Sequence, residues 1–396
     1  MLAKVLRLFV LFFVINSSRL TAVYAPIPEV EQGKAFTVYL AAGAHYDSNV
    51  FGRASDEIGS YVYEIAPTVA FNASLDAKTF ASASYRLSYD YMPDRPGKKE
   101  LNSHEFIGRI AHTFTPQMEI DLSDTYQISR NPASLLPGLA TVVNTDQSYR
   151  RNQLDGRFAT GLTKRTGLTF KGRDTRYNYQ EEALGLSLDR VEYLVGLVAS
   201  HAVLPELQAI LEARHLVIDY DTGGDTKNKR SVFLLLGADQ KINARLSLTG
   251  RLGLEYRRRS GDRSDTLPYA ELAAKLDYGK GSYVSVGYGY SVEETSSIEL
   301  YTDMSVNRFF VNVQQSITTQ LTATASLTWE PSLLHGRVGL RPNQNETNTQ
   351  FGCALIYRPR KNWSLSATFD HDRIVSDELS RQLKRARTGL TARYVF

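Results

Sequence analysis

The sequence holds a single cysteine, Cys353, among its 396 residues. One cysteine excludes an intramolecular disulfide framework and any cysteine-rich metal site. A strong excess of charge of one sign is also lacking, because the sequence contains 46 Lys and Arg and 42 Asp and Glu. The resulting net charge of +4 does not by itself indicate a nucleic-acid partner. We therefore expect no nucleic acid, no cofactor and no metal ion.

Long apolar runs are missing after the first 25 residues. No later stretch approaches the roughly 18 apolar residues that a membrane-spanning helix needs. Charged residues make up 22% of the chain and the mean hydropathy is -0.29, yet 23 Tyr and 17 Phe are present. A polar, Tyr-rich chain of this size is either a soluble β protein or a barrel that hides its polar half inside.

The N-terminal region favours the barrel. Basic residues precede the apolar run 8–15, and small residues follow it. This is the pattern of a secretory signal peptide, which is too short to span a membrane as a helix. Cleavage after Ala25 would leave a proline first, so cleavage after Ala22 is the alternative. We predict a signal peptide over residues 1–25 and export from the cytosol.

Residues of alternating polarity recur through the rest of the chain, as in a β-strand with one apolar face. In the stretch 321–330, Leu and Ala alternate with Thr and Ser. The clearest segments of this kind are ten to fourteen residues long, enough for a tilted transmembrane strand. We count eighteen: 35–47, 60–72, 79–91, 103–115, 117–130, 147–162, 166–179, 188–202, 206–219, 229–241, 244–258, 267–278, 282–294, 304–317, 320–332, 347–359, 362–375 and 384–396.

Tight connections alternate with longer polar ones between these segments. Short turns at one rim and longer loops at the other are typical of bacterial outer-membrane barrels. We predict that residues 26–396 form one all-β domain, a transmembrane antiparallel up-and-down β-barrel of about eighteen strands, with short periplasmic turns and longer extracellular loops. A secreted, soluble β-sandwich or solenoid is the alternative, but a sandwich of eighteen strands would need a domain boundary that the sequence does not show.

If the apolar faces meet lipid, the polar faces line the lumen. The mixture of signs predicts weak ion selectivity, and the alternative is a wall of opposed charges with no selectivity at all. The pore-lining candidates are Glu64, Arg86, Arg109, Asp121, Arg157, Arg173, Glu212, Arg214, Arg245, Arg251, Glu255, Glu271, Lys275, Arg308, Glu330, Arg358, Asp370, Arg387 and Arg393.

Two further groups of residues are candidates for a role at the outer rim. Six cations on neighbouring strands could bind lipopolysaccharide phosphates, or form a solvated charge run without a fixed ligand: Lys227, Lys229, Arg230, Arg257, Arg258 and Arg259. The longest and least polar loop could fold inward and narrow the pore, or pack over the rim or in an oligomer. Its candidate constriction residues are Leu135, Leu136, Pro137, Leu139, Val142 and Val143.

Catalysis is not indicated. The most suggestive histidine is His371, which lies between Asp370 and Asp372. Alternation sends the two acids to one face and the histidine to the other, so they cannot form a triad. No HExxH, GxSxG or phosphate-binding glycine loop occurs in the sequence. We expect no enzymatic activity.

Three motifs resemble those of a known family. The segment Tyr46-Asp-Ser-Asn-Val-Phe51, the stretch 116–132 and the stretch 288–295 are similar to the β-barrel porin 2 family, and the similarity runs over nearly the whole mature chain. Its members are described as outer-membrane barrels of unassigned role, some encoded beside exopolysaccharide export genes. The resemblance implies an outer-membrane location and, as partners, periplasmic components of exopolysaccharide export.

These observations lead to one predicted function and two alternatives. We expect a passive, weakly selective pore for small hydrophilic solutes or saccharides in the bacterial outer membrane. An exopolysaccharide conduit and a structural barrel with a closed lumen are the alternatives. The expected partners are outer-membrane lipids, lipopolysaccharide and the barrel-assembly machinery, which would read the terminal Phe396.

Overall fold

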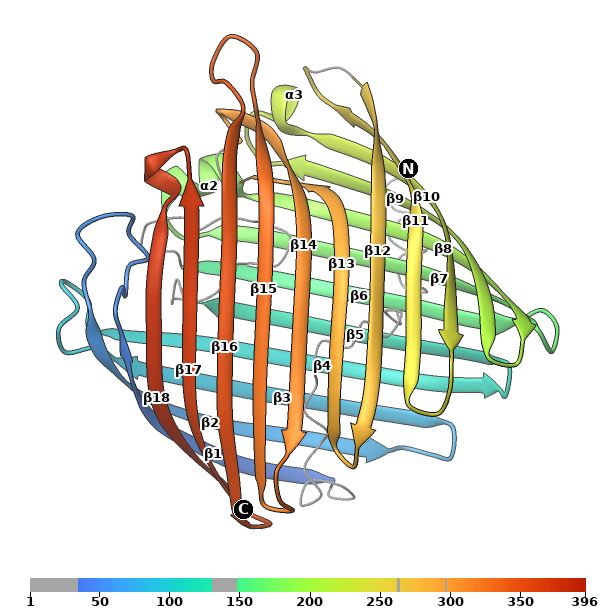
Figure 1. Ribbon diagram of the computed structural model, residues 1–396, viewed down its shortest axis with the longest axis horizontal. Coiled ribbons are helices and arrows are strands. Elements are labelled where there is room, and N and C mark those ends of the chain that lie inside the picture. Colours follow the sequence, from blue (N-terminus) through green and yellow to red (C-terminus); the bar gives the residue numbers. More distant parts are fainter. Residues whose placement is uncertain (1–34, 130–147, 262–263, 296–297) are drawn as a thin grey trace.

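The protein is an eighteen-stranded antiparallel β-barrel, seen in a computed structural model that describes residues 35–129, 148–261, 264–295 and 298–396 (Figure 1). Each strand pairs with the next along the chain, and β18 pairs back with β1 to close the sheet. This architecture confirms the transmembrane up-and-down barrel predicted from the alternation. Among the described residues, no helix is both long and apolar enough to cross a membrane.

The strands agree with the predicted segments to within a few residues at each end. They are β1 (Phe36–Asp47), β2 (Ser60–Ser74), β3 (Thr79–Tyr91), β4 (Glu100–Thr115), β5 (Met118–Ser129), β6 (Tyr149–Gly161), β7 (Thr166–Tyr179), β8 (Arg190–Leu204), β9 (Leu207–Tyr220), β10 (Lys229–Lys241), β11 (Leu246–Arg259), β12 (Ser264–Gly279), β13 (Ser282–Glu293), β14 (Tyr301–Ser316), β15 (Leu321–Gly336), β16 (Gln344–Arg360), β17 (Trp363–Ser376) and β18 (Leu383–Val395).

Alternation along each strand separates an apolar outer face from a polar inner face. On β11 the leucines at 248, 252 and 254 are exposed, whereas Arg251 and Glu255, next to Leu252 and Leu254 in the sequence, are buried inside the barrel. Because successive side chains point to opposite sides of a sheet, the same chain supplies both a lipid-facing surface and a polar lumen.

Strands on opposite walls of the barrel run in different directions. In Figure 1 the yellow to red strands in front, β11 to β18, cross the blue and green strands β2 to β7 behind them. Closing a sheet into a barrel requires such a tilt of the strands against the barrel axis. The tilt lets side chains from strands that are not neighbours approach one another inside.

Short turns join the strands at the periplasmic rim. In the turn before β11, the Asn243 side chain accepts hydrogen bonds from the backbone N–H groups of Arg245 (2.8 Å) and Leu246 (2.9 Å), as an Asn at a tight turn commonly does. Arg245 therefore lies in an exposed turn and not on a strand. It lies one residue before β11 begins, at the edge of the wall and not within it.

The seam between the first and last strands is tied at both ends. Backbone pairing runs from Tyr39 opposite Val395 to Asp47 opposite Arg387. At the outer end, the Asp47 carboxylate and the Arg385 guanidinium form a buried ion pair. At the other end, the backbone N–H of Phe396 donates to the carbonyl of Val38 (2.9 Å).

The buried apolar side chains gather near the outer loops. One cluster contains Tyr149, Tyr177 and Tyr179 with Leu188 of the short helix α2 (Glu182–Leu188). Another packs Ile218 and Tyr220 of β9 against Ile298. Two further clusters are built around Val50 and around Tyr301. The outer loops, including α3 (Gly224–Lys227) and η2 (Leu379–Arg381), are therefore anchored by small local cores.

Candidate pore and its outer mouth

Ion pairs between neighbouring strands line much of the inner wall. Most of the predicted pore-lining residues take part in them, each with an opposite charge on the next strand. We call these the lumen-wall pairs: Glu64–Arg86, Arg109–Asp121, Glu119–Arg157, Asp155–Arg173, Asp239–Arg251, Arg308–Glu330 and Asp372–Arg387.

Several lumen-wall pairs remain open to solvent. The side chain of Arg86 is 51% exposed and that of Arg109 is 47% exposed, although both are paired. Arg109 holds Asp121 with two hydrogen bonds, of 2.8 and 2.7 Å, in the bidentate geometry that suits a guanidinium. Half-exposed charges on the inner face indicate space for water inside the barrel at this level.

A longer chain of contacts crosses several strands between β7 and β12. Lys171 and Arg214 both bind the buried carboxylate of Glu212, at 3.3 and 2.8 Å. Arg214 also donates to the hydroxyl of Tyr269 (3.1 Å) on β12, and Tyr269 in turn binds Glu271. Because β10 and β11 lie between β9 and β12, these side chains form a second layer over the inner wall.

Other predicted pore-lining residues have more local contacts. Glu255 is buried and accepts a hydrogen bond from Ser231. Lys275 pairs with Asp277 on its own strand (2.9 Å). The Arg393 guanidinium lies over the Tyr39 ring, 3.8 Å from its centroid. Asp370 lies opposite Arg387 in the strand register, and Arg358 is exposed near the periplasmic end of β16.

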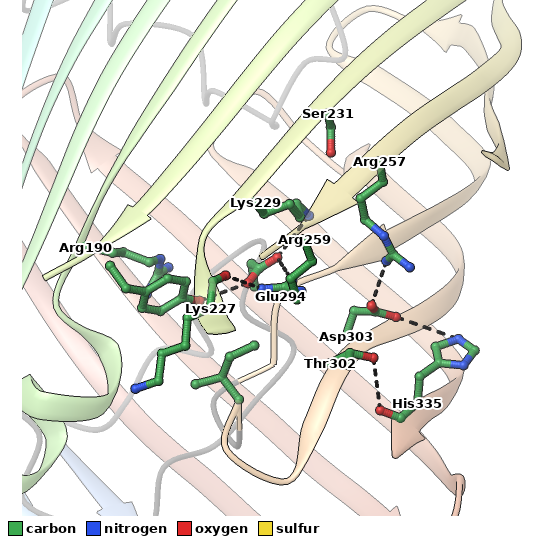
Figure 2. Close-up of polar contacts among 12 residues, drawn as sticks. Arg190, Lys227, Lys229, Ser231, Arg257, Arg259, Glu294, Thr302, Asp303 and His335 are labelled. Carbon is green, nitrogen blue, oxygen red and sulfur yellow. Dashed lines mark hydrogen bonds and ion pairs between the residues drawn. The ribbon is translucent and has the colours of Figure 1, made fainter. Parts of the chain in front are cut away.

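A buried network of charges occupies the outer end of the barrel (Figure 2). Its centre is Glu294, which follows β13 and is 4% exposed at its side chain. One carboxylate oxygen lies 2.9 Å from Lys229 Nζ and 2.6 Å from Arg259 Nη2, and the other accepts a hydrogen bond from Tyr220 (2.8 Å). The carboxylate thus has three partners from β9, β10 and β11.

Two more ion pairs extend this network. Arg257 of β11 reaches Asp303 of β14, with 2.7 Å between Nη1 and Oδ2, and Asp303 lies 3.9 Å from His335. Lys227 of α3 lies 2.5 Å from Glu299. We call Lys227, Lys229, Arg257, Arg259, Glu294, Glu299 and Asp303 the outer-mouth network. Its acids come from one loop and the adjacent start of β14, and its bases come from β10, β11 and α3.

Electrostatics explains why a carboxylate is stable in this place. Burial by itself raises the pKa of Glu294, because the charged form loses its hydration. The positive charges of Arg259 and Lys229 and their hydrogen bonds outweigh burial, so the pKa of Glu294 is held well below its usual range. The carboxylate is therefore ionised at every ordinary pH, and it keeps two buried cations compensated.

The outer-mouth network corrects one prediction. The six cations proposed as one exposed surface lie on two sides of the wall: Lys227, Lys229, Arg257 and Arg259 are buried, whereas Arg230 and Arg258 are exposed. Strand alternation is the reason, because residues 229 and 230 must point to opposite faces. Lys229, Arg257 and Arg259 therefore hold the buried acids Glu294 and Asp303, and Lys227 of α3 pairs with the exposed Glu299. Arg230 and Arg258 remain on the outward face.

Contacts between loops join the outer rim over a long arc. Arg337 donates to the carbonyls of Ile298 (2.9 Å) and Thr226 (3.2 Å), and the Tyr301 hydroxyl donates to Glu378 (3.2 Å). The predicted constriction loop cannot be compared with these, because residues 135–143 lie outside the part of the chain that the structure describes. The predicted signal peptide lies outside it as well.

Sequence reasoning missed the acids of the outer-mouth network. The predicted segment 282–294 ends at Glu294, and Glu299 and Asp303 fall between it and the predicted segment 304–317, where alternation indicates no partner for them. A signal was present, since three acids in the stretch 293–299 are followed by a fourth at 303 and face a strongly basic stretch on β10 and β11. The predicted separation of His371 from its flanking acids is reproduced: Asp372 pairs with Arg387 inside, and His371 lies opposite Phe351, an exposed outer-face residue.

Comparisons with known proteins support the fold. No family model matches the chain, and no curated protein sequence matches it. A BenF-like porin from Pseudomonas fluorescens Pf-5 has a similar structure, with a TM-score of 0.50 and 9% sequence identity over 92% of this chain and 99% of the porin. A mutant of the ferric enterobactin receptor PfeA from Pseudomonas aeruginosa also has a TM-score of 0.50, at 9% identity over 92% of this chain and 81% of the receptor. The chain therefore shares the barrel fold of a porin and of a transport receptor.

Proposed function

We propose that this chain is a bacterial outer-membrane protein that forms a passive, weakly selective pore for small hydrophilic solutes, saccharides among them. The lumen-wall pairs are the observation that carries the proposal. They place water-exposed cations such as Arg86 and Arg109, and water-exposed acids such as Glu119 and Asp239, along the inner face. Because each charge is paired, the wall is polar but has little net charge. A wall of this kind hydrates a pore without strongly favouring cations or anions.

Single-channel recording tests this proposal directly. Purified full-length protein in planar bilayers is expected to give stable ohmic conductance, with a reversal potential near zero in a salt gradient. A strongly cation- or anion-selective reversal potential would contradict weak selectivity. Liposome swelling with neutral sugars of increasing size then measures the solute cutoff, and heat-denatured protein is the control for detergent leaks.

A structural barrel with a closed lumen is the second candidate, and the outer-mouth network favours it. Buried ion pairs join β10, β11 and β14 at the outer end, Tyr220 of β9 adds a hydrogen bond to Glu294, and Arg337 connects further loops along the rim. If these loops seal the mouth, correctly folded barrel inserted in bilayers shows no conductance, whereas a variant with Glu294 and Asp303 both neutralised conducts. Equal conductance of the two proteins argues against a closed mouth.

The finer assignments rest on the sequence. The resemblance to the β-barrel porin 2 family supports a role in exopolysaccharide export with periplasmic partners. A conduit for a polyanionic polysaccharide is expected to have a lumen dominated by arginine. The inner wall of this barrel carries charges of both signs, so it supports that role less strongly. Recovery of a periplasmic export component with the affinity-purified barrel tests that role.

The exposed aromatic Phe396, which ends the chain beside Tyr394, supports recognition by the barrel-assembly machinery. Impaired assembly of a Phe396→Ser variant tests that contact.

A further inference from the structure

The outward face of β5, β6 and β7 differs from the rest of the barrel exterior. Elsewhere the middle of this face is largely apolar, as at Leu234 of β10, Leu252 of β11 and Leu327 of β15, all exposed. On β5 to β7, the strand register instead sets Asp124 opposite Leu154, and Leu154 opposite Asp174. Two carboxylates thus flank an apolar residue on a face that alternation directs toward the membrane.

Depth makes these acids costly in lipid. Asp124 occupies the middle of β5, and Asp174 lies just beyond the middle of β7. Ionisable side chains on the lipid side of a barrel are destabilising, and most so near the bilayer midplane. A carboxylate at this depth is stable when polar groups cover it. We therefore expect polar groups, and not lipid acyl chains, to contact Asp124 and Asp174.

The charges on this face have room for further partners. The Asp124 carboxylate accepts a hydrogen bond from the Asn152 amide (3.0 Å). Asp174 lies 3.6 Å from the Arg176 guanidinium, which is 58% exposed. Arg150, on the same side of β6, is exposed too. We call Asp124, Arg150, Asn152, Asp174 and Arg176 the β5–β7 patch.

Glycines beside the patch permit close approach. Gly108, Gly156 and Gly172 lie at the middle of β4, β6 and β7, and Gly156 lies opposite Gly172 in the register. A Cβ at Gly108 would meet only the Phe106 ring, at 3.5 Å, so the conformation there does not require glycine. Small residues at a membrane-facing surface let another protein backbone come near.

Charge composition identifies the occupant. The β5–β7 patch carries two carboxylates and two guanidiniums, so a copy of the patch offers each group an opposite charge. Two other pairs of outward charges differ: Arg230 lies opposite Arg258, and Arg373 opposite Lys384. Those purely basic pairs suit phosphates, which the two acids of the patch would repel. We propose that the β5–β7 patch is an interface with a second copy of this chain.

Site-directed cross-linking tests the interface in outer membranes, because the only native cysteine can be removed. In a Cys353→Ser background, Leu154→Cys places a thiol between the two acids. The matched control is Leu254→Cys, an exposed outward residue of β11. Oxidation is expected to give several-fold more disulfide-linked dimer from the first variant. Resistance of the folded barrel to heat on a gel verifies that both variants are assembled.

A second pair of substitutions separates a specific interface from random collision. Replacing both acids, Asp124→Leu and Asp174→Leu, in the Leu154→Cys protein removes the charge complementarity without removing the thiol. The dimer yield is then expected to fall to that of the Leu254→Cys control. Equal yields for Leu154→Cys and Leu254→Cys overturn the proposal, as does cross-linking of Leu154→Cys only to a different protein, or to none, in assembled barrels.

Discussion

Arg86 on the lumen wall and Arg259 at the outer mouth both pair with a glutamate, but their surroundings differ. Half of the Arg86 side chain is open to solvent, whereas only 2% of the Arg259 side chain is. Water screens the first pair and has left the second. The same two residue types therefore make a hydrated wall in one region and a structural junction in the other, and burial decides which.

The largest expected difference between these regions is in stability. Glu294→Gln keeps the shape of the side chain but leaves Lys229 and Arg259 buried without a counter-charge, which costs about 3–5 kcal/mol for a buried pair. Glu64→Gln breaks a solvent-exposed pair with Arg86 and costs about 0–1 kcal/mol. Urea unfolding in lipid vesicles, followed by the fluorescence of Trp329 and Trp363, measures both. Equal losses would remove the distinction between the regions.

Ion selectivity tests the solvent-exposed pairs of the lumen wall. Asp121→Asn leaves the half-exposed Arg109 without its carboxylate, so the pore is expected to shift toward anions. The shift in the permeability ratio is expected to reach at most about fivefold, since a unit charge at 4 Å in water contributes about 1 kcal/mol. Reversal potentials in a salt gradient report it, and Asp121→Glu, which keeps the charge, is the control. An unchanged reversal potential for Asp121→Asn would place the pair away from the ion path.

The outward cations of β10 and β11 are expected to contribute less to stability than the buried cations next to them. The double variant Arg230→Ala, Arg258→Ala removes outward cations, and we expect it to change the free energy of unfolding by no more than about 0.5 kcal/mol. It is expected to lose co-purifying lipopolysaccharide, measured as phosphate per barrel. The control removes Arg360 and Lys361, two cations at the periplasmic rim. Equal lipopolysaccharide content in the two double variants argues against a site at Arg230 and Arg258.

Acidification from pH 7 to pH 5 is expected to have the smallest effect, because it should leave the contribution of Glu294 to stability unchanged. Because the pKa of Glu294 is lowered in the folded protein, its contribution to stability is present above the ordinary carboxyl pKa of about 4.3 and is lost as the pH falls through the folded value. The difference in unfolding free energy between the native protein and Glu294→Gln should therefore be the same at pH 7 and pH 5. It should shrink only below the ordinary carboxyl pKa. A difference that already shrinks by pH 5 would show that Glu294 is less well compensated than the contacts indicate.

The fold was predictable because its rule is local. Alternation with a period of two repeats along every strand, and the turn lengths alternate, so strand number, strand direction and facing all follow from neighbouring residues. The same rule, applied strictly, would have separated Lys229 from Arg230. Reading them together as one basic surface ignored the alternation.

The contacts inside the barrel were less predictable, for a geometric reason. Arg257 and Asp303 belong to strands with two others between them, and Glu294 meets Lys229 and Arg259 through the course of a loop. Such contacts depend on the tilt of the strands and on the path of the loop. The polarity pattern of a single segment predicts neither the tilt nor the path. Lumen-wall pairs between adjacent strands, such as Arg109 with Asp121, needed only the register across one short turn.

The seam between β1 and β18 has a consequence for how the barrel is made. Every other pairing in the sheet joins consecutive strands, whereas Tyr39 finds its partner at Val395, at the far end of the chain. Contacts between such distant positions form slowly, because a large chain loop must be closed before they contribute. Until then β1 and β18 each present an unpaired edge that can join another chain. The ring can be completed only after β18 has been synthesised and delivered, so both edges stay open to misassembly until all eighteen strands are present.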